Sequence, residues 1–176
     1  MKNKILLITA ITFLVCSAFT LILSINWQIK DKEYAIKFDT RGATGTMTGL
    51  KGSINFDEKN LNQSGFDVSI DVNTINTGGS LKNKHALAEG FFNGEKYPQI
   101  KFQSVKIEKT AAAYQVVGNL TIKQTTKNIS IPFAFENYGN EGKFKGNFTI
   151  NRSEYNLNKW GVGEVVKIEL VIPVKK

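Results

Sequence analysis

The chain has 176 residues, enough for one domain with a sizeable core. Hydrophobic residues make up 41% and charged residues 22%, which is ordinary for a globular protein, and the net charge of +8 comes from Lys and Arg residues scattered along the chain. This charge indicates a solvated surface or contact with an anionic membrane surface, and the lack of a basic stripe or nucleic-acid-binding motif argues against nucleic acid as a partner.

Residues 1–25 form a separate N-terminal segment. Lys2 and Lys4 make a positively charged start, and the run from Ile5 to Ile25 is apolar apart from isolated Thr and Ser residues. This layout is typical of an export signal peptide. The run is also long enough to span a bilayer, so the sequence leaves open a cleaved signal peptide or an uncleaved membrane anchor.

Either fate places the domain at 26–176 outside the cytoplasm. A signal peptide would end at Ala18 or Ser24 and leave a periplasmic or secreted protein, whereas an anchor would hold the domain to a membrane through residues 5–25. A lipid attached at Cys16 is a third, less favoured alternative. Because Cys16 is the only cysteine, the domain depends on its core and has no disulfide.

From Trp27 onward, apolar and polar residues alternate, which is typical of half-buried strands. Eight strands are predicted, around residues 34–38, 54–56, 66–72, 100–107, 114–122, 129–135, 144–150 and 166–174. Val105 is out of phase with Ile100 and Phe102, so we expect a β-bulge or a strand break near Ser104. Pro132 indicates a sheet edge or a bulge, because proline cannot donate to a strand ladder.

One short helix is predicted over residues 81–90, where apolar residues recur at helical spacing. Asn93-Gly94 ends it, and Tyr97-Pro98 begins an extended segment. Eight strands with one apolar face each require either a second sheet or closure into a barrel. Glycines in residues 42–52 mark sharp bends and favour the barrel.

No catalytic, metal or cofactor site is predicted. His85 is the only histidine, and it is joined on its helix face only by Glu89, which does not make a metal site. No nucleophile elbow and no phosphate-binding loop is present. Arg152 and Glu154, two residues apart on an expected strand, form either an ion pair at the surface or barrel mouth, or an anchor for the polar head of a ligand.

Four segments resemble the YceI-like family of lipocalin-like barrels. The first combines Phe91-Phe92 and Tyr97-Pro98 with Ile100-x-Phe102-x-Ser104, and the others are residues 52–57, 118–122 and 150–155, in the family's order between about Trp27 and Val174. The resemblance implies an all-β fold, an antiparallel eight-stranded lipocalin-like β-barrel with one short helix. It also implies binding, and carriage or storage, of an isoprenoid or other fatty-acyl-type amphiphile.

Inward-facing apolar side chains are therefore the predicted ligand-binding residues. They are Ile36, Phe38, Ile54, Phe56, Phe66, Val68, Ile70, Phe91, Phe92, Tyr97, Ile100, Phe102, Leu120, Ile122, Phe133, Phe135, Phe148 and Ile150. The rings of Phe91, Phe92 and Tyr97 are expected to gate the barrel mouth. Two alternative functions stay open. One is a stress-linked or surface structural module with a filled barrel, and the other is an enzyme acting on lipids, although no set of residues in the sequence predicts a catalytic site. A homodimer is also compatible with the sequence.

Overall fold

The computed structural model describes residues 25–111, 113–158 and 161–176. The predicted signal peptide or anchor therefore lies, apart from Ile25, outside the described residues. Across these described ranges, no helix is long and apolar enough to cross a membrane.

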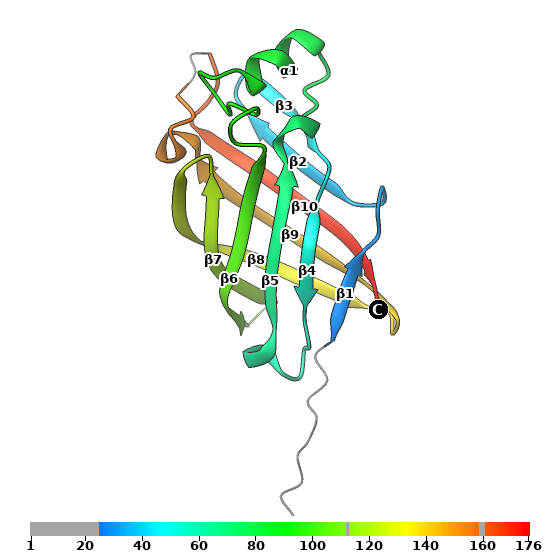
Figure 1. Cartoon of the computed structure of the whole chain (residues 1–176). Helices are drawn as coiled ribbons and strands as arrows, with labels where there is room; N and C mark the ends of the chain where they lie inside the picture. Colours follow the sequence, from blue (N-terminus) through cyan, green and yellow to red (C-terminus); the bar gives the residue numbers. More distant parts are fainter. Residues whose placement is uncertain (1–24, 112, 159–160) are drawn as a thin grey trace, which may run out of the picture.

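Ten strands form one antiparallel sheet that closes on itself (Figure 1). They are β1 (Asn26–Ile29), β2 (Ala35–Thr40), β3 (Ala43–Met47), β4 (Lys51–Asn55), β5 (Gly65–Asp71), β6 (Gln99–Lys109), β7 (Tyr114–Ile122), β8 (Thr125–Asn137), β9 (Glu141–Asn151) and β10 (Val165–Lys175). The strand order is β1-β4-β5-β6-β7-β8-β9-β10-β2-β3, and β1 also pairs with β10. The ring from β1 through β4–β10 and back therefore contains eight strands, which confirms the predicted eight-stranded barrel.

Two strands, β2 and β3, are additional to this ring of eight, and they arise because the chain bends twice near its start. β10 pairs with β2 over Lys167–Val171 and with β1 at Val174 and Lys175, so β1 and β2 lie along the same neighbour. β3 and β4 are separated by a bend that contains Gly49 at φ +74°, and β4 then carries Gly52 at φ +128°. A Cβ at Gly52 would lie 2.1 Å from the carbonyl oxygen of Asp67, so only glycine fits this crossing.

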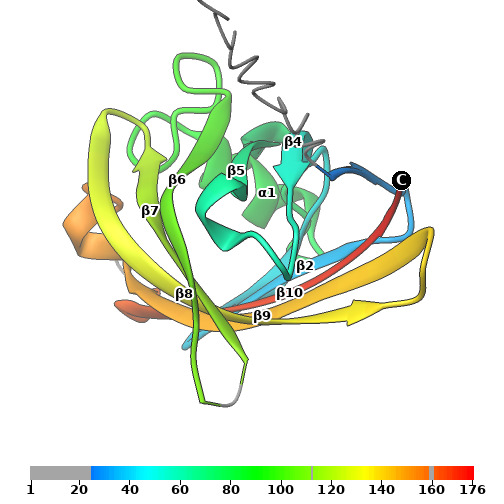
Figure 2. The same cartoon turned by 90° about the horizontal axis from the view of Figure 1, so that it is seen from below.

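Figure 2, which views the barrel from below, shows β4–β7 as one curved wall and β8, β9, β10 and β2 as the facing wall. The predicted bulge is confirmed, since the register between β6 and β7 shifts between Ser104 and Lys106. β8 pairs with β7 over Thr125–Phe133 and with β9 only over Phe133–Asn137. Pro132 therefore lies where one side of β8 is an edge, as predicted.

Helix α1 (Ser80–Leu87) covers one end of the barrel (Figure 1). It is shorter than the predicted 81–90 because the following turn takes over its carbonyl groups. The N–H of Phe92 donates to the oxygen of Ala86, and that of Gly94 to the oxygen of Leu87, at 3.0 Å each. Three 3-10 helices, η1 (Leu61–Gln63), η2 (Val72–Thr74) and η3 (Arg152–Tyr155), complete the connections.

The barrel interior is packed at the end opposite α1, where β1 begins and the chain ends (Figure 1). Seven aromatic rings gather there in edge-to-face, tilted and stacked contacts: Trp27, Phe56, Phe66, Tyr114, Phe133, Phe135 and Phe144. We call this set the aromatic cluster. Phe56 is at its centre, 1% exposed, and the indole N–H of Trp27 donates to the carbonyl of Phe56 at 2.9 Å.

Candidate functional site

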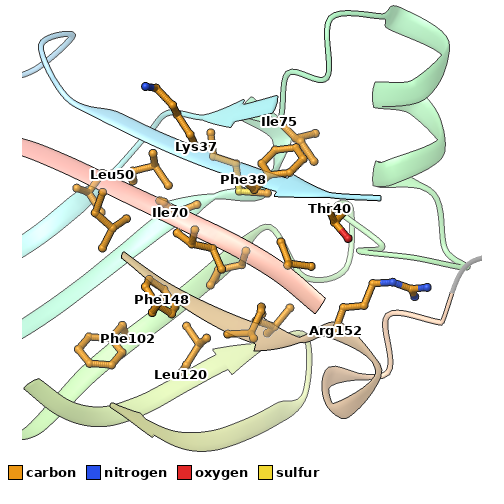
Figure 3. A pocket seen from close by; sticks show the side chains of 18 of the residues that line it. Lys37, Phe38, Thr40, Leu50, Ile70, Ile75, Phe102, Leu120, Phe148 and Arg152 are labelled. Atoms are coloured by element: carbon orange, nitrogen blue, oxygen red, sulfur yellow. The ribbon is translucent and has the colours of Figure 1, made fainter. Parts of the chain in front are cut away.

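A cavity of about 430 Å³ occupies the barrel between α1 and the aromatic cluster (Figure 3). This volume lies in the range of about 300–1,000 Å³ typical of small-molecule sites. Its wall is almost entirely apolar. Fifteen of the eighteen predicted ligand-binding residues lie on this wall: Ile36, Phe38, Ile54, Phe66, Val68, Ile70, Phe91, Phe92, Ile100, Phe102, Leu120, Ile122, Phe133, Phe148 and Ile150.

Three predicted residues do not line the cavity. Phe56 and Phe135 belong to the aromatic cluster, with their ring centroids 5.1 Å apart, so they lie in the packed end of the barrel. Tyr97 lies away from the cavity wall, with the Lys96 ammonium 5.5 Å from its ring centroid. For these three residues, alternation and aromaticity identified an inward or covered position but not whether the space beside it is empty.

Other lining residues were missed for two reasons. Val116, Ile131, Phe144, Ile168, Leu170 and Ile172 occupy the apolar phase of strands that were predicted, so the signal for them was present. Met47, Leu50, Ile75 and Leu157 also line the cavity. Met47 lies on the unpredicted strand β3 and the other three outside the strands, so no periodicity pointed to them.

The two halves of the barrel differ in how tightly they are filled. At the aromatic end, Trp27 is 2% exposed and Val174 0%, as expected for a close-packed interior. Toward α1, the inward residues Val68, Ile70 and Leu170 are only partly buried although they lie on the cavity wall. Their remaining exposure is toward the cavity, so this half of the barrel is hollow.

Three phenylalanine rings form the floor of the cavity. The centroids of Phe66, Phe133 and Phe144 are 5.5, 5.5 and 5.9 Å apart, so the rings make a nearly equilateral triangle. Behind it, the Phe56 ring lies 6.2, 5.5 and 5.4 Å from them, in the same order. The three floor rings line the cavity and Phe56 does not, so the hollow stops at this layer.

Polar groups gather at the other end of the cavity, beneath and beside α1. Thr40, Thr77, Lys82 and His85 contribute to its wall there, and a smaller polar hollow of about 250 Å³ adjoins it, sharing Thr40, Thr77 and Lys82 and adding Asp39. The Thr40 hydroxyl donates to the carbonyl of Val165 at 2.8 Å, and the Thr77 hydroxyl to the Asn83 side-chain oxygen at 2.7 Å. Their oxygens keep lone pairs for a further donor. The site therefore has an apolar interior and a polar mouth.

Two lysines on the wall do not bring charge into the cavity. Figure 3 shows Lys37 pointing away from the apolar side chains, and its ammonium lies 3.4 Å from Glu169. The ammonium of Lys145 likewise pairs with Glu136 on the outer face. The neighbouring Lys145 ammonium and the Tyr138 hydroxyl hold the pKa of Glu136 below its usual value.

Arg152 differs from its predicted position. It lies in the 3-10 helix η3 rather than on a strand, is 6% exposed, and donates from Nε to the carbonyl of Gly163 at 2.8 Å. Its terminal nitrogens donate to the carbonyls of Leu157 and Val162. Glu154 is exposed. Arg152 thus holds Leu157, Val162 and Gly163 together at the edge of the cavity (Figure 3).

Tyr155, which lies in the same 3-10 helix as Arg152, carries a buried hydroxyl group. The residue is 1% exposed, and its oxygen has no hydrogen-bond partner among the described residues. Burial, and then the nearby Glu154 carboxylate, raise the pKa of Tyr155 to about 12.

In the described part of the chain, no group of three or more His, Cys, Asp or Glu residues is placed to hold a metal ion.

Known proteins share this barrel. The family model of the YceI-like domain matches residues 27–174. The UPF0312 protein YE1254 of Yersinia enterocolitica is 30% identical over 137 residues, which cover 74% of this chain and 71% of that protein.

Two solved structures are similar in fold. BcnA of Burkholderia cenocepacia has a TM-score of 0.79 at 22% identity and covers 83% of this chain and 99% of its own. A polyisoprenoid binding domain from Saccharophagus degradans has a TM-score of 0.65 at 12% identity, covering 87% and 99%.

Proposed function

This chain belongs to the YceI-like family, and we propose from that premise that its barrel binds one long apolar amphiphile, an isoprenoid or a fatty-acyl-type chain. The observation that carries the proposal is the hollow half of the barrel, where apolar side chains such as Val68 and Leu170 are left partly exposed to a cavity of about 430 Å³. Each methylene moved from water into such a space contributes about 0.8 kcal/mol. A long chain can therefore bind well with few polar contacts.

The polarity of the two cavity ends supports an amphiphile rather than a plain hydrocarbon. The hydroxyls of Thr40 and Thr77 and the ammonium of Lys82 are placed to meet a polar head, while the walls beyond them offer only apolar contact. The Saccharophagus degradans domain, which shares the fold, is described as polyisoprenoid binding, and this favours an isoprenoid among the candidate chains.

The proposed role is carriage or storage outside the cytoplasm. The export-signal layout of the N-terminal segment, from Lys2 through the apolar run to Ile25, supports that location. Leu81, 65% exposed on α1, and the neighbouring Lys82 and Lys84 give the mouth end an apolar and basic surface suited to brief contact with an anionic membrane. Such contact would let a chain pass between bilayer and barrel.

The rival functions receive less support. A filled structural barrel would have close-packed inward residues throughout, as only the aromatic end has. For an enzyme, the cavity wall would need reactive groups placed together, whereas its polar residues gather at the mouth and Arg152 is engaged with main-chain carbonyls. We therefore propose binding without turnover.

The test is to purify the protein from its own cells without detergent and analyse an organic extract by mass spectrometry. A carrier should release an apolar compound in a fixed ratio to protein, and the extracted protein should then bind the neutral fluorophore N-phenyl-naphthylamine in competition with that compound. An unrelated exported protein purified identically is the control. Protein that yields no enriched compound and does not bind the fluorophore would contradict the proposal.

A further inference from the structure

We infer that the floor formed by Phe66, Phe133 and Phe144 fixes the orientation of the ligand and limits the length of chain that the barrel accepts. This inference rests on the proposed function. In it, the methyl end of the chain lies against the three rings and the polar head stays at the α1 end.

The floor is a firm stop because it is supported from behind. The centroid of the Phe56 ring lies 5.4–6.2 Å from those of all three floor rings. Behind Phe56, the Phe135 ring lies 5.1 Å from Phe56, and the Trp27 ring lies 5.1 Å from Phe135, again between centroids. Phe56 and Trp27 are 1% and 2% exposed, so no free volume lies behind the floor for the rings to move into. A chain that reached the floor could extend further only by displacing several packed aromatic rings.

The orientation follows from where polar groups lie. The described residues of the loops at the aromatic end, 57–64 and 138–140, contribute nothing to the cavity wall. At the α1 end, Thr77, Lys82 and His85 reach that wall from the loop and helix above it. A polar head forced against Phe66 and Phe144 would lose its hydrogen bonds to water without replacement, which is strongly unfavourable. The chain therefore enters with its apolar end first.

A limit on the length of the bound chain can be measured from the affinities of a series of ligands. With linear primary alcohols of increasing carbon number, affinity should rise about fourfold for each methylene added while the growing chain still finds cavity wall. Once the methyl end reaches the floor, each further methylene stays at the mouth in water, and the increments should fall to near zero. The wild-type protein should thus show a clear break in a plot of log affinity against chain length.

The floor variants are Phe66→Leu and Phe66→Ala. Phe66 is only partly buried and lines the cavity, so its shortening should deepen the hollow toward Phe56. The break should move to longer chains, by more in Phe66→Ala than in Phe66→Leu. Phe148→Ala is the matched control, because Phe148 is also a partly buried ring on the wall but, unlike Phe66, is not one of the paired rings of the floor. It should lower affinity for all chains and leave the break where it was.

The orientation of the bound ligand can be tested separately by tryptophan fluorescence. The chain has two tryptophans, so Trp160→Phe leaves Trp27, in the aromatic cluster, as the only one. A fatty acid with a nitroxide near its methyl end should quench Trp27 fluorescence more strongly than one with the nitroxide beside the carboxylate. Stronger quenching from the carboxylate end would overturn the orientation.

The outcomes separate the inference from the function on which it rests. If no alcohol displaces N-phenyl-naphthylamine at any length, the proposed function fails and the inference with it. If alcohols bind but wild-type affinity rises without a break, or if the break moves in Phe148→Ala and not in the Phe66 variants, binding stands and the floor is not the limit. The wild-type series decides even if both Phe66 variants fail to fold.

Discussion

The rings of Phe91 and Phe92 stand almost perpendicular, at 81°, with their centroids 4.9 Å apart, and both line the cavity at the α1 end. The turn that carries them is held to the helix by the bond from the Phe92 N–H to the oxygen of Ala86. Since the aromatic cluster closes the other end, we expect a ligand to enter at the α1 end and to pass near this pair. We expect the pair to act as a gate.

Phe92→Ala should speed release of a bound apolar fluorophore more than it lowers stability. Removing the ring leaves Phe91 without its edge-to-face partner and opens the cavity wall at the mouth. Stopped-flow release and thermal melting on the same protein measure the two effects. If Phe92 is only a core residue, truncation should destabilise the fold by about 3–5 kcal/mol and leave the release rate unchanged.

Tyr97→Ala is the control for this gate. Tyr97 was also predicted to gate the mouth, but its ring lies off the cavity wall beside the Lys96 ammonium. Its truncation should therefore leave fluorophore release close to the wild-type rate. Acceleration equal to that of Phe92→Ala would show that the whole turn, rather than the Phe91–Phe92 pair, controls access.

Val68→Trp should block the cavity without unfolding the barrel. Val68 is partly buried on the wall, so the larger side chain can enter space that a ligand would use. Affinity for an apolar fluorophore should fall about tenfold or more, equivalent to about two methylenes losing their contact. Titration and thermal melting give both values. Asp67→Trp, at the neighbouring exposed position on β5, should leave affinity unchanged.

A fall in stability of about 1–3 kcal/mol in Val68→Trp, with unaltered binding, would contradict the hollow interior. In a filled barrel the indole would have to displace packed side chains, whereas in the observed cavity it replaces empty space.

Arg152→Met should destabilise the protein by about 2–4 kcal/mol, because the carbonyls of Leu157, Val162 and Gly163 lose their donor. Chemical denaturation measures this change, and limited proteolysis should show faster cleavage after η3. Arg41→Met, at an exposed arginine, should change stability by no more than about 0.5 kcal/mol. Equal effects of the two variants would show that the Arg152 hydrogen bonds contribute little.

Tyr155 should make stability fall at high pH. In the unfolded chain a tyrosine loses its proton near pH 10, whereas in the fold the pKa of Tyr155 is about 12. The folded state therefore binds the proton more tightly, and stability is lost as pH rises from about 10 to about 12, by roughly 2–3 kcal/mol at the upper limit. Denaturation at a series of pH values measures this slope.

Tyr155→Phe isolates this contribution. The variant should lose the Tyr155 part of the high-pH slope, while the parts due to Tyr114 and Tyr138, whose pKa values are also raised, should remain. At neutral pH the variant should equal the wild type or be up to about 1 kcal/mol more stable, because it removes a buried hydroxyl that lacks a partner among the described residues. Marked destabilisation at neutral pH would show that the hydroxyl is bonded after all.

The barrel was predictable because alternation along a strand directly reports which face is buried. The phase change after Phe102 located the Ser104 bulge, and Pro132 located a sheet edge, since each is a local property of the chain. The strand character of β3 (Ala43–Met47) was missed because its Gly and Thr residues lack apolar alternation, and it is paired through β2 and the Thr46–Asn76 bridge.

The site was only partly predictable, because periodicity shows that a residue faces inward but not whether anything fills the space in front of it. Phe56 and Phe66 alternate in the same way in sequence, yet one is the centre of a packed cluster and the other is a cavity floor. That difference depends on seven rings from several strands meeting at one end. Arg152 was misplaced for a related reason, since its partners are carbonyls of a loop with no sequence signature.

The position of the chain ends has a practical consequence. Ile25 accepts a hydrogen bond from the N–H of Phe56 at 3.0 Å, and Lys176 lies over the Trp27 ring, so both described ends lie at the aromatic end (Figure 1). A support or label joined at Lys176, or directly before Ile25, would therefore leave the mouth beside α1 unobstructed. By the same geometry, a molecule held to a membrane through the segment before Ile25 would present its opening away from that membrane, so its cargo would be exchanged with whatever surface lies across the intervening space.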